Sequence, residues 1–173
     1  MAYRVSVSDT EPVSRAEAVA YAKIENTDEN SIVDALISSC RNELEEWLKI
    51  PLITQVWAEY ADTFNTPIYA PMIPVTSVVL EVADSDAVYA ADTNIAVRVD
   101  TGRIAPTTSF SPAIEFDAFR FTFTYTVTSI MPVLKDALLE LFSYRFYNRG
   151  NVEAAAIPAS VKAMVGHLRV FSQ

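Results

Sequence analysis

Residue types that commonly perform chemistry are scarce in this sequence. His167 is the only histidine, so a metal site built from two histidines is excluded. Cys40 is the only cysteine, and it falls on the apolar face of a predicted helix, where core packing explains it better than nucleophilic chemistry. The three glycines form neither a phosphate-binding loop nor a G-x-S-x-G nucleophile turn. We predict no catalytic residue, no metal ligand and no cofactor.

Carboxylates are plentiful, but their spacing indicates solvation rather than acid–base chemistry. Glu43, Glu45 and Glu46 fall on or near the polar face of a predicted amphipathic helix. Asp84 and Asp86 do not follow the calcium-loop pattern, and turn formation explains them better. An enzyme with two catalytic carboxylates would need an inward-facing pair with perturbed pKa values, and the sequence offers no candidate pair. We therefore predict that the chain is not an enzyme.

Two arginines near the end of a long apolar helix have two interpretations. Arg145 and Arg149 are flanked by Tyr144, Phe146 and Tyr147. Their stems can lie along the helix while the charged heads reach water. Alternatively, they can cross an interface to carboxylates, because arginine and tyrosine are favoured at interface hot spots. The sequence leaves both interpretations open.

The helix that carries these arginines is predicted from residue 132 to 149. Pro132 suits the first helical turn, and Gly150 suits the position just beyond the end. The segment is apolar over roughly two thirds of its circumference, whereas a surface helix usually needs an apolar stripe of about 100°. We expect this helix to be covered on more than one side, by its own domain or by a neighbouring subunit.

Three further helices are predicted near the two ends of the chain. Ser14 and Glu17 form a capping-box pattern that starts a helix ending near Lys23. Apolar residues at helical spacing predict an amphipathic helix from about 31 to 49 and a last helix from about 158 to 171.

The middle of the chain has strand patterns. Phe119, Phe121, Phe123 and Tyr125 alternate with polar residues, so 119–127 is the clearest strand. Other predicted strands are 53–61, 75–82 and 95–99, while residues 1–13 are an extended arm and the prolines at 67, 71 and 74 mark a loop. We predict an α+β fold in which N- and C-terminal helices form a helical bundle with a small antiparallel β insertion of four to six strands. The chain is then one domain, 1–173, with helical parts at 1–50 and 131–173 and the β insertion at 51–130.

The charge of the chain limits its partners. The net charge of −9 argues against gripping a nucleic-acid backbone, because that contact needs clustered lysine and arginine. Residues 132–173 carry three acids and five bases, so the C-terminal part is mildly basic. Neither a secretory signal nor a membrane span is predicted.

Several segments stand in a distinctive order between residues 13 and 170. They are Val13-Ser-Arg-Ala-Glu-Ala-Val-Ala-Tyr-Ala-Lys-Ile24, Asp28-Glu29, the helix at 32–48, Pro51-Leu-Ile-Thr-Gln-Val-Trp57, Pro132-Val-Leu-Lys-Asp-Ala-Leu-Leu139, Tyr144-Arg-Phe-Tyr-Asn-Arg149 and Ile157-Pro158. Together they resemble the head–tail connector, or adaptor, proteins of tailed bacteriophages.

This resemblance implies a structural virion protein rather than an enzyme. Such proteins form a ring, usually of twelve copies, below the portal of the filled head. The ring extends the channel through which double-stranded DNA passes without specific binding, and it provides the docking site for the stopper or tail. The implied partners are the portal protein, the stopper or a tail-side neck protein, and other copies of the chain. The implied location is the virion neck, after assembly in the host cytoplasm and genome packaging.

The resemblance also implies two sets of contact residues. The helices around 31–49 and 132–149 would form the bundle and much of the contact between subunits, and the C-terminal segment would contact the portal. The expected subunit-interface residues are Trp47, Tyr144, Arg145, Tyr147 and Arg149. The expected portal-contacting residues are Val161, Lys162, Val165, His167, Leu168, Arg169 and Phe171.

An alternative of another class remains open. The chain can be a monomeric module that binds a small ligand or a glycan on its β insertion. Trp57, Tyr60, Tyr69 and Tyr89 would then form a stacking platform. Little polar chemistry converges near these aromatic residues, which counts against this alternative.

Overall fold

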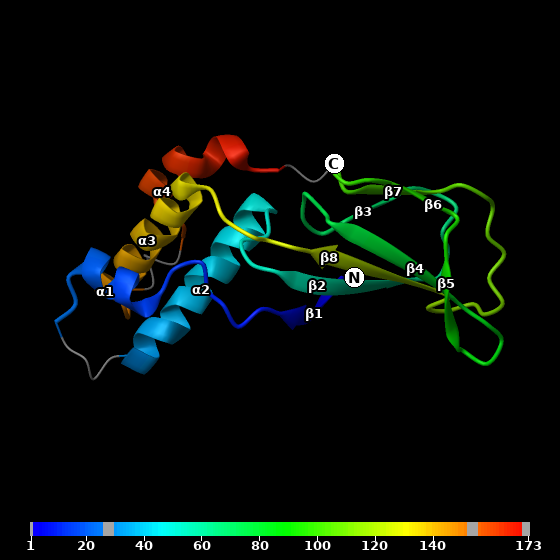
Figure 1. The fold of residues 1–173 in the computed structure, drawn as a ribbon, viewed down its shortest axis with the longest axis horizontal. Helices are drawn as coiled ribbons and strands as arrows, with labels where there is room; N and C mark the ends of the chain where they lie inside the picture. The colour runs from blue at the N-terminus through cyan, green and yellow to red at the C-terminus, as the bar shows by residue number, and fades with distance from the viewer. Residues whose placement is uncertain (1, 26–29, 152–155, 171–173) are drawn as a thin grey trace. The chain divides into compact units, whose positions relative to one another are not determined.

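The computed structural model divides into two compact units, each built from two stretches of the chain. The β unit comprises residues 1–8 and 53–127, and the helical unit comprises residues 9–52 and 128–173. Figure 1 shows the elements of both units. The structure describes residues 2–25, 30–151 and 156–170. In these ranges no helix is both long and apolar enough to cross a bilayer.

The β unit contains two antiparallel sheets in the described residues. The larger sheet has the strand order β1-β2-β8-β4-β5, and the smaller has the order β3-β7-β6. The larger sheet consists of β1 (Tyr3–Val7), β2 (Gln55–Ala61), β8 (Phe119–Tyr125), β4 (Ser77–Ala83) and β5 (Tyr89–Asp92). The smaller consists of β3 (Ile68–Tyr69), β7 (Arg103–Pro106) and β6 (Ile95–Arg98).

The central strand β8 explains the core of the β unit. Its alternation places Phe119, Phe121, Phe123 and Tyr125 on one face, and all four are fully buried. Ile104 of β7 belongs to the same core, so the small sheet covers this face of the large one. Burial of each such large side chain contributes about 1.5–3 kcal/mol relative to exposure.

The helical unit starts from the predicted capping box. Helix α1 (Arg15–Ala22) is capped by Ser14, whose Oγ accepts the Glu17 N–H at 3.3 Å, while the Glu17 carboxylate accepts the Ser14 N–H at 2.9 Å. Helices α2 (Asn30–Leu48) and α3 (Pro132–Tyr147) follow, and α4 (Ala159–Val165) continues into a short 3₁₀ turn, η3 (Gly166–Leu168). Pro132 lies in the first turn of α3, as predicted.

Helix α3 is covered within its own unit. It packs against α1, α2 and α4, and its buried residues face more than one side. This arrangement accounts for the wide apolar surface that the sequence shows on this segment. The composition of α3 therefore does not by itself require a neighbouring subunit.

The predicted fold class is wrong, because it treats the β-sheets as a small insertion into a helical bundle. The described residues contain eight strands in two sheets, so the protein is a sheet-rich mixed α/β structure, not a helical bundle with a small β insertion. The residues expected to form an extended arm supply strand β1, which pairs with β2. The other strands missed from the sequence, β3, β5 and β7, have two to four residues, too few for a recognisable alternation.

Candidate interaction surfaces

The described residues contain no group of three or more histidine, cysteine, aspartate or glutamate side chains able to hold a metal ion. Cys40 is buried in the helical core, and burial raises the pKa of its thiol to about 12. The thiol is therefore protonated at neutral pH. His167 is exposed in η3. Surfaces and buried polar networks are thus the features of interest.

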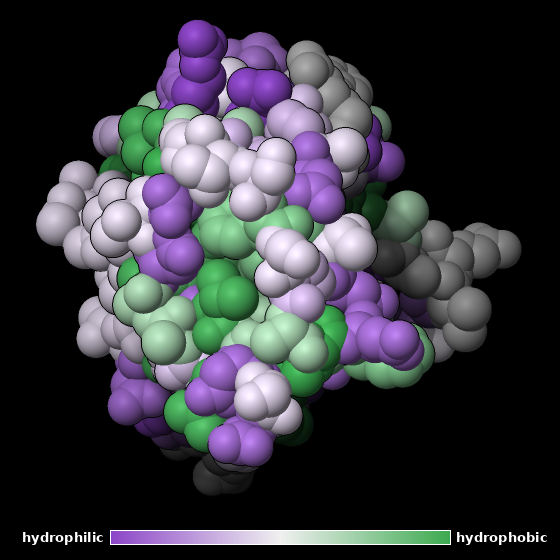
Figure 2. Space-filling view, turned by 90° about the vertical axis from the view of Figure 1, so that its right-hand side faces the viewer, coloured by the Kyte–Doolittle hydropathy of each residue, from purple (hydrophilic) through white to green (hydrophobic). Residues whose placement is uncertain are grey.

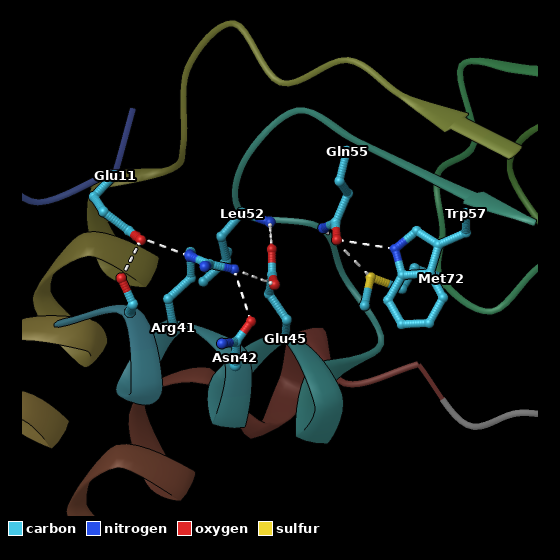
Figure 3. A network of polar contacts seen from close by, with 9 residues as sticks. Glu11, Arg41, Asn42, Glu45, Leu52, Gln55, Trp57 and Met72 are labelled. Atoms are coloured by element: carbon cyan, nitrogen blue, oxygen red, sulfur yellow. Dashed lines mark hydrogen bonds and ion pairs between the residues drawn. The ribbon is translucent and has the colours of Figure 1, made fainter. Parts of the chain in front are cut away.

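A buried ionic network lies in the helical unit (Figure 3). Arg41 of α2 donates from Nε to Glu11 Oε2 at 2.8 Å and from Nη1 to Glu45 Oε2 at 2.9 Å. The Leu52 N–H donates to the other Glu45 oxygen at 2.8 Å, and the Ser38 hydroxyl donates to Glu11 Oε1 at 2.6 Å. The network ties the segment before α1 and the segment after α2 to α2 itself.

Glu45 corrects an expectation from the sequence. Helical spacing placed it on the solvated face of α2 with Glu43 and Glu46, yet Glu45 is completely buried and Arg41 is 3% exposed. The reason is tertiary, because chain segments outside the helix cover this part of its polar face. Figure 3 also draws a separate polar group in the β unit, where the Trp57 Nε1–H donates to buried Gln55 at 2.9 Å.

The residues expected at the subunit interface have partners within the helical unit. Arg145 forms an ion pair with Glu43 of α2. The Tyr147 hydroxyl donates to the Ala22 carbonyl, although much of the ring is exposed. Arg149 donates to the Phe146 carbonyl at 2.9 Å and lies over the Phe146 ring. Tyr144 is half-buried on the same helix.

Trp47 joins the C-terminal segment to α2. Arg169 donates to the Trp47 carbonyl at 3.0 Å, and its guanidinium lies 5.1 Å from the centre of the Trp47 ring. Of the expected portal-contacting residues, Val161 and Val165 are buried in the helical core. Lys162, His167 and Arg169 are exposed, Leu168 is half-buried, and Phe171 lies outside the described residues.

Helix α2 has a second apolar stripe beside its buried one. Ile32, Ala35, Leu36 and Ser39 line a shallow, open hollow of about 360 Å³ together with Ser31. Ile32 is 45% exposed, and Ala35 and Ser39 are small, so a side chain from outside can enter between them. The hollow is therefore an open, largely apolar depression on the surface of α2.

A cluster of aromatic and charged side chains crosses the other face of the large sheet, away from the phenylalanines of β8. The rings of Tyr3 and Tyr60 stack at 6.1 Å, and those of Tyr60 and Tyr89 meet edge to face at 5.9 Å. Arg120 lies 4.8 Å from the centre of the Tyr89 ring and forms a two-point ion pair with Glu81, at 2.6 and 2.7 Å. We call these five residues the tyrosine cluster.

The pKa values in this cluster follow from its hydrogen bonds. The bond with Tyr3 lowers the pKa of Tyr60, and Arg120 lowers it further. The Arg120 guanidinium lowers the pKa of Glu81, which stays ionised. The cluster therefore presents fixed charges and ring edges at a half-exposed surface.

The predicted stacking platform does not assemble as expected. Only Tyr60 and Tyr89 of the four residues meet. Trp57 pairs with Phe123 and packs on the core side of the sheet, and Tyr69 lies on β3 in the smaller sheet. Tyr3, which the sequence placed in an extended arm, takes part instead. The sequence carried no local signal for this position, because the pairing of β1 with β2 is long-range.

The fold is that of a mixed α/β protein, and its described polar groups form internal networks and exposed clusters. No family model matches the sequence, and no curated protein matches it. Solved structures do match. One is a chain from the neck of an empty gene transfer agent (GTA) particle, computed with C6 symmetry, with TM-score 0.81, 16% identity, and 100% of this chain and 97% of that chain covered.

Two further matches come from related particles. A chain from the virion of a native GTA particle has TM-score 0.80 and 18% identity, with 100% and 97% of the two chains covered. A chain from the neck of a native GTA particle, computed with C12 symmetry, has TM-score 0.68 and 18% identity at the same coverage. The protein thus has the fold of these chains from GTA particles. The resemblance to head–tail connector proteins is confirmed at the level of the fold.

Proposed function

We propose that this protein is a structural component of the neck of a phage-like particle and acts as a head–tail connector, or adaptor, without enzymatic activity. The observation that carries the proposal is the fold match over the full length of this chain and 97% of a neck chain. Location in the virion neck follows from the same match. In this proposal the whole chain, 1–173, works as one adaptor domain.

The adaptor assembles as a ring of twelve copies below the portal protein, after synthesis in the host cytoplasm. Neck structures with C6 and C12 symmetry support a cyclic arrangement. The ring extends the DNA channel and offers a docking site for the stopper or tail. Twelve copies at −9 each carry a charge of about −108, which discourages DNA phosphates from adhering to the channel wall.

Contact between copies is best placed at the hollow of α2. A ring needs two different complementary surfaces on each copy, and this hollow offers an apolar concave one. The C-terminal segment is the proposed portal contact, through its exposed residues Lys162, His167 and Arg169. Arg145, Tyr147 and Arg149 stay candidates for the rim of the subunit interface, beside their internal contacts.

Sedimentation velocity tests the proposal. The purified chain is run alone and mixed with the portal protein encoded near it. We expect the mixture to co-sediment with a mass increment that corresponds to a ring. A compact monomer that does not associate with the portal at micromolar concentration contradicts the proposal.

The variant Ala35→Arg places a charge in the hollow and is expected to abolish the ring-sized increment. Ala20→Arg is the matched control, because Ala20 is exposed on α1 and lies outside the hollow. If Ala35→Arg assembles as the control does, the ring contact lies elsewhere.

A further inference from the structure

Two loops and a hairpin meet at one end of the large sheet. The Tyr89 hydroxyl donates to the Asp117 carbonyl at 2.5 Å, and the Asp117 N–H donates to Asp62 Oδ1 at 2.8 Å. The hairpin between β4 and β5 is closed by Asp84, whose Oδ1 accepts the N–H groups of Asp86 and Val88, both at 2.9 Å. These contacts fix the relative positions of three exposed segments within the β unit.

Hydrophobic side chains are strongly exposed on this end. Phe116 is 73% exposed, the largest value among the large hydrophobic residues described, and Val88 is 60% exposed. Phe116 lies next to Asp117, and Val88 lies next to Tyr89 of the tyrosine cluster. Figure 2 looks onto this side of the molecule, and hydrophobic residues gather in its middle with hydrophilic residues around them. Exposed apolar patches with a polar rim mark binding surfaces.

The rim of this patch is acidic. Its carboxylates are those of Asp62, Asp84, Asp86, Glu115 and Asp117, and all five residues are exposed. Within the described part of the chain, none of the five forms an ion pair. The nearby base, Arg120, is held by Glu81 through two hydrogen bonds and does not neutralise them. The rim therefore carries exposed negative charge that no described ion pair neutralises.

We propose that this end of the β unit, centred on Phe116 and Val88, docks a basic segment of another protein. Exposed aromatic and aliphatic side chains supply the central anchor that interface hot spots require. The acidic rim selects lysine and arginine in the partner and repels nucleic acid and acidic segments. A bound metal ion is not the occupant, because the described carboxylates form no group suited to hold one.

Fluorescence anisotropy of the full chain with a defined probe tests this proposal. The probe is a labelled ten-residue peptide of alternating arginine and leucine, and its glutamate–leucine counterpart is the charge control. We expect binding of the basic peptide only, with affinity that falls as salt rises because the rim charges are exposed. Binding of both peptides, or of neither, overturns the proposal.

Matched variants locate the binding. Phe116→Ser and the double variant Asp86→Lys/Glu115→Lys are expected to weaken binding about tenfold or more. Val99→Ser and Asp100→Lys are the controls, because both positions are exposed on the same unit but outside this end, and they should change affinity less than twofold. Equal losses in variants and controls mean that only the overall acidity attracts the peptide, and this overturns the assignment.

Assembly distinguishes this inference from the neck proposal. Phe116→Ser should co-sediment with the portal as the unaltered chain does, and loss of the ring would assign this end to contact between copies instead.

A photo-crosslinking residue at 116 in assembled particles should capture a segment with more lysine and arginine than aspartate and glutamate. Capture of only an acidic segment, or of a second copy, contradicts the proposal. If the chain binds the basic peptide but forms no ring, the neck proposal is contradicted and the present inference is supported.

Discussion

Two arginine–glutamate pairs, one in each unit, have nearly the same chemistry and different surroundings. The side chains of Arg41 and Glu45 in the helical unit are 4% and 0% exposed, whereas those of Arg120 and Glu81 in the β unit are 34% and 20% exposed. The buried pair is surrounded by further hydrogen bonds that fasten chain segments together. The half-exposed pair orders a tyrosine surface that remains open to solvent. Burial thus separates an ion pair that ties chain segments together from one that orders a half-exposed aromatic surface.

The largest difference between the pairs should appear when one partner is removed. Glu45→Ala leaves the Arg41 charge and the Leu52 N–H without their buried acceptor. We expect the free energy of unfolding to fall by about 3–5 kcal/mol, measured by urea denaturation. Glu46→Ala, which removes an exposed partner of Lys49, is the control and should cost less than about 1 kcal/mol. A loss for Glu45→Ala as small as the control's would show that the network is not structurally important.

The next largest loss of stability is expected when a polar group replaces Cys40 in the apolar core of the helical unit. Cys40→Ser buries a hydroxyl where a thiol packs among aliphatic side chains. We expect a loss of about 1–3 kcal/mol in the free energy of unfolding. The control variant Ser39→Ala, at an exposed neighbouring position, should change stability by less than about 0.5 kcal/mol.

Thiol labelling of the unaltered chain at pH 8 should require unfolding, and fast labelling of the folded chain would contradict the buried, protonated thiol.

Removing Arg120 from the half-exposed pair should change the free energy of unfolding only a little, but it should change the pKa of a neighbouring tyrosine. Arg120→Ala is expected to cost about 1 kcal/mol or less. It should also raise the pKa of Tyr60, because Arg120 is one of the groups that lower it. Titration of the tyrosine ring signals by NMR measures this change, with Arg98→Ala as the control on the other sheet. A Tyr60 pKa that does not move when Arg120 is removed would show that the guanidinium does not act on this hydroxyl.

The smallest effect concerns the exposed carboxylate of Glu17, whose side chain is 44% exposed. Lys135 and Ser14 lower the pKa of Glu17 from 4.5 to about 2. A lowered pKa in the folded state means that the stabilisation is complete above about pH 4.5 and is lost as the pH falls through about 2. Lys135→Met should raise the Glu17 pKa in a carboxyl-detected NMR titration, and Lys49→Met should not. Equal titration curves in the two variants would contradict the contribution of Lys135.

Local patterns in the sequence predicted the parts that depend on neighbouring residues. The alternation of Phe119, Phe121, Phe123 and Tyr125 identified the central strand and its buried face, and all four are buried. Ser14 and Glu17 identified the start of α1 through a capping box, which forms. These signals are strong because the interactions they describe act over two to four residues.

Long-range contacts were not predictable in the same way. Helical periodicity gave Glu45 a solvated position, because it carries no information about the segments that cover α2 from outside. Tyr3 belongs to a surface cluster only because β1 pairs with β2. The acidic end of the β unit assembles from Asp62, the β4–β5 hairpin and Asp117, which are far apart in the sequence.

The strand order of the large sheet also determines when the chain can fold during synthesis. Strand β1 waits for its partner, because Ala58 of β2, which pairs with Tyr3, is synthesised 55 residues later. The sheet remains open until β8 is complete at Tyr125, because β2 and β4 are joined only through that strand. A nascent chain that ends before β8 therefore exposes unpaired apolar strands, a state prone to aggregation on the ribosome. Slower elongation or lower temperature during expression should favour recovery of folded protein, since late long-range pairing limits the rate.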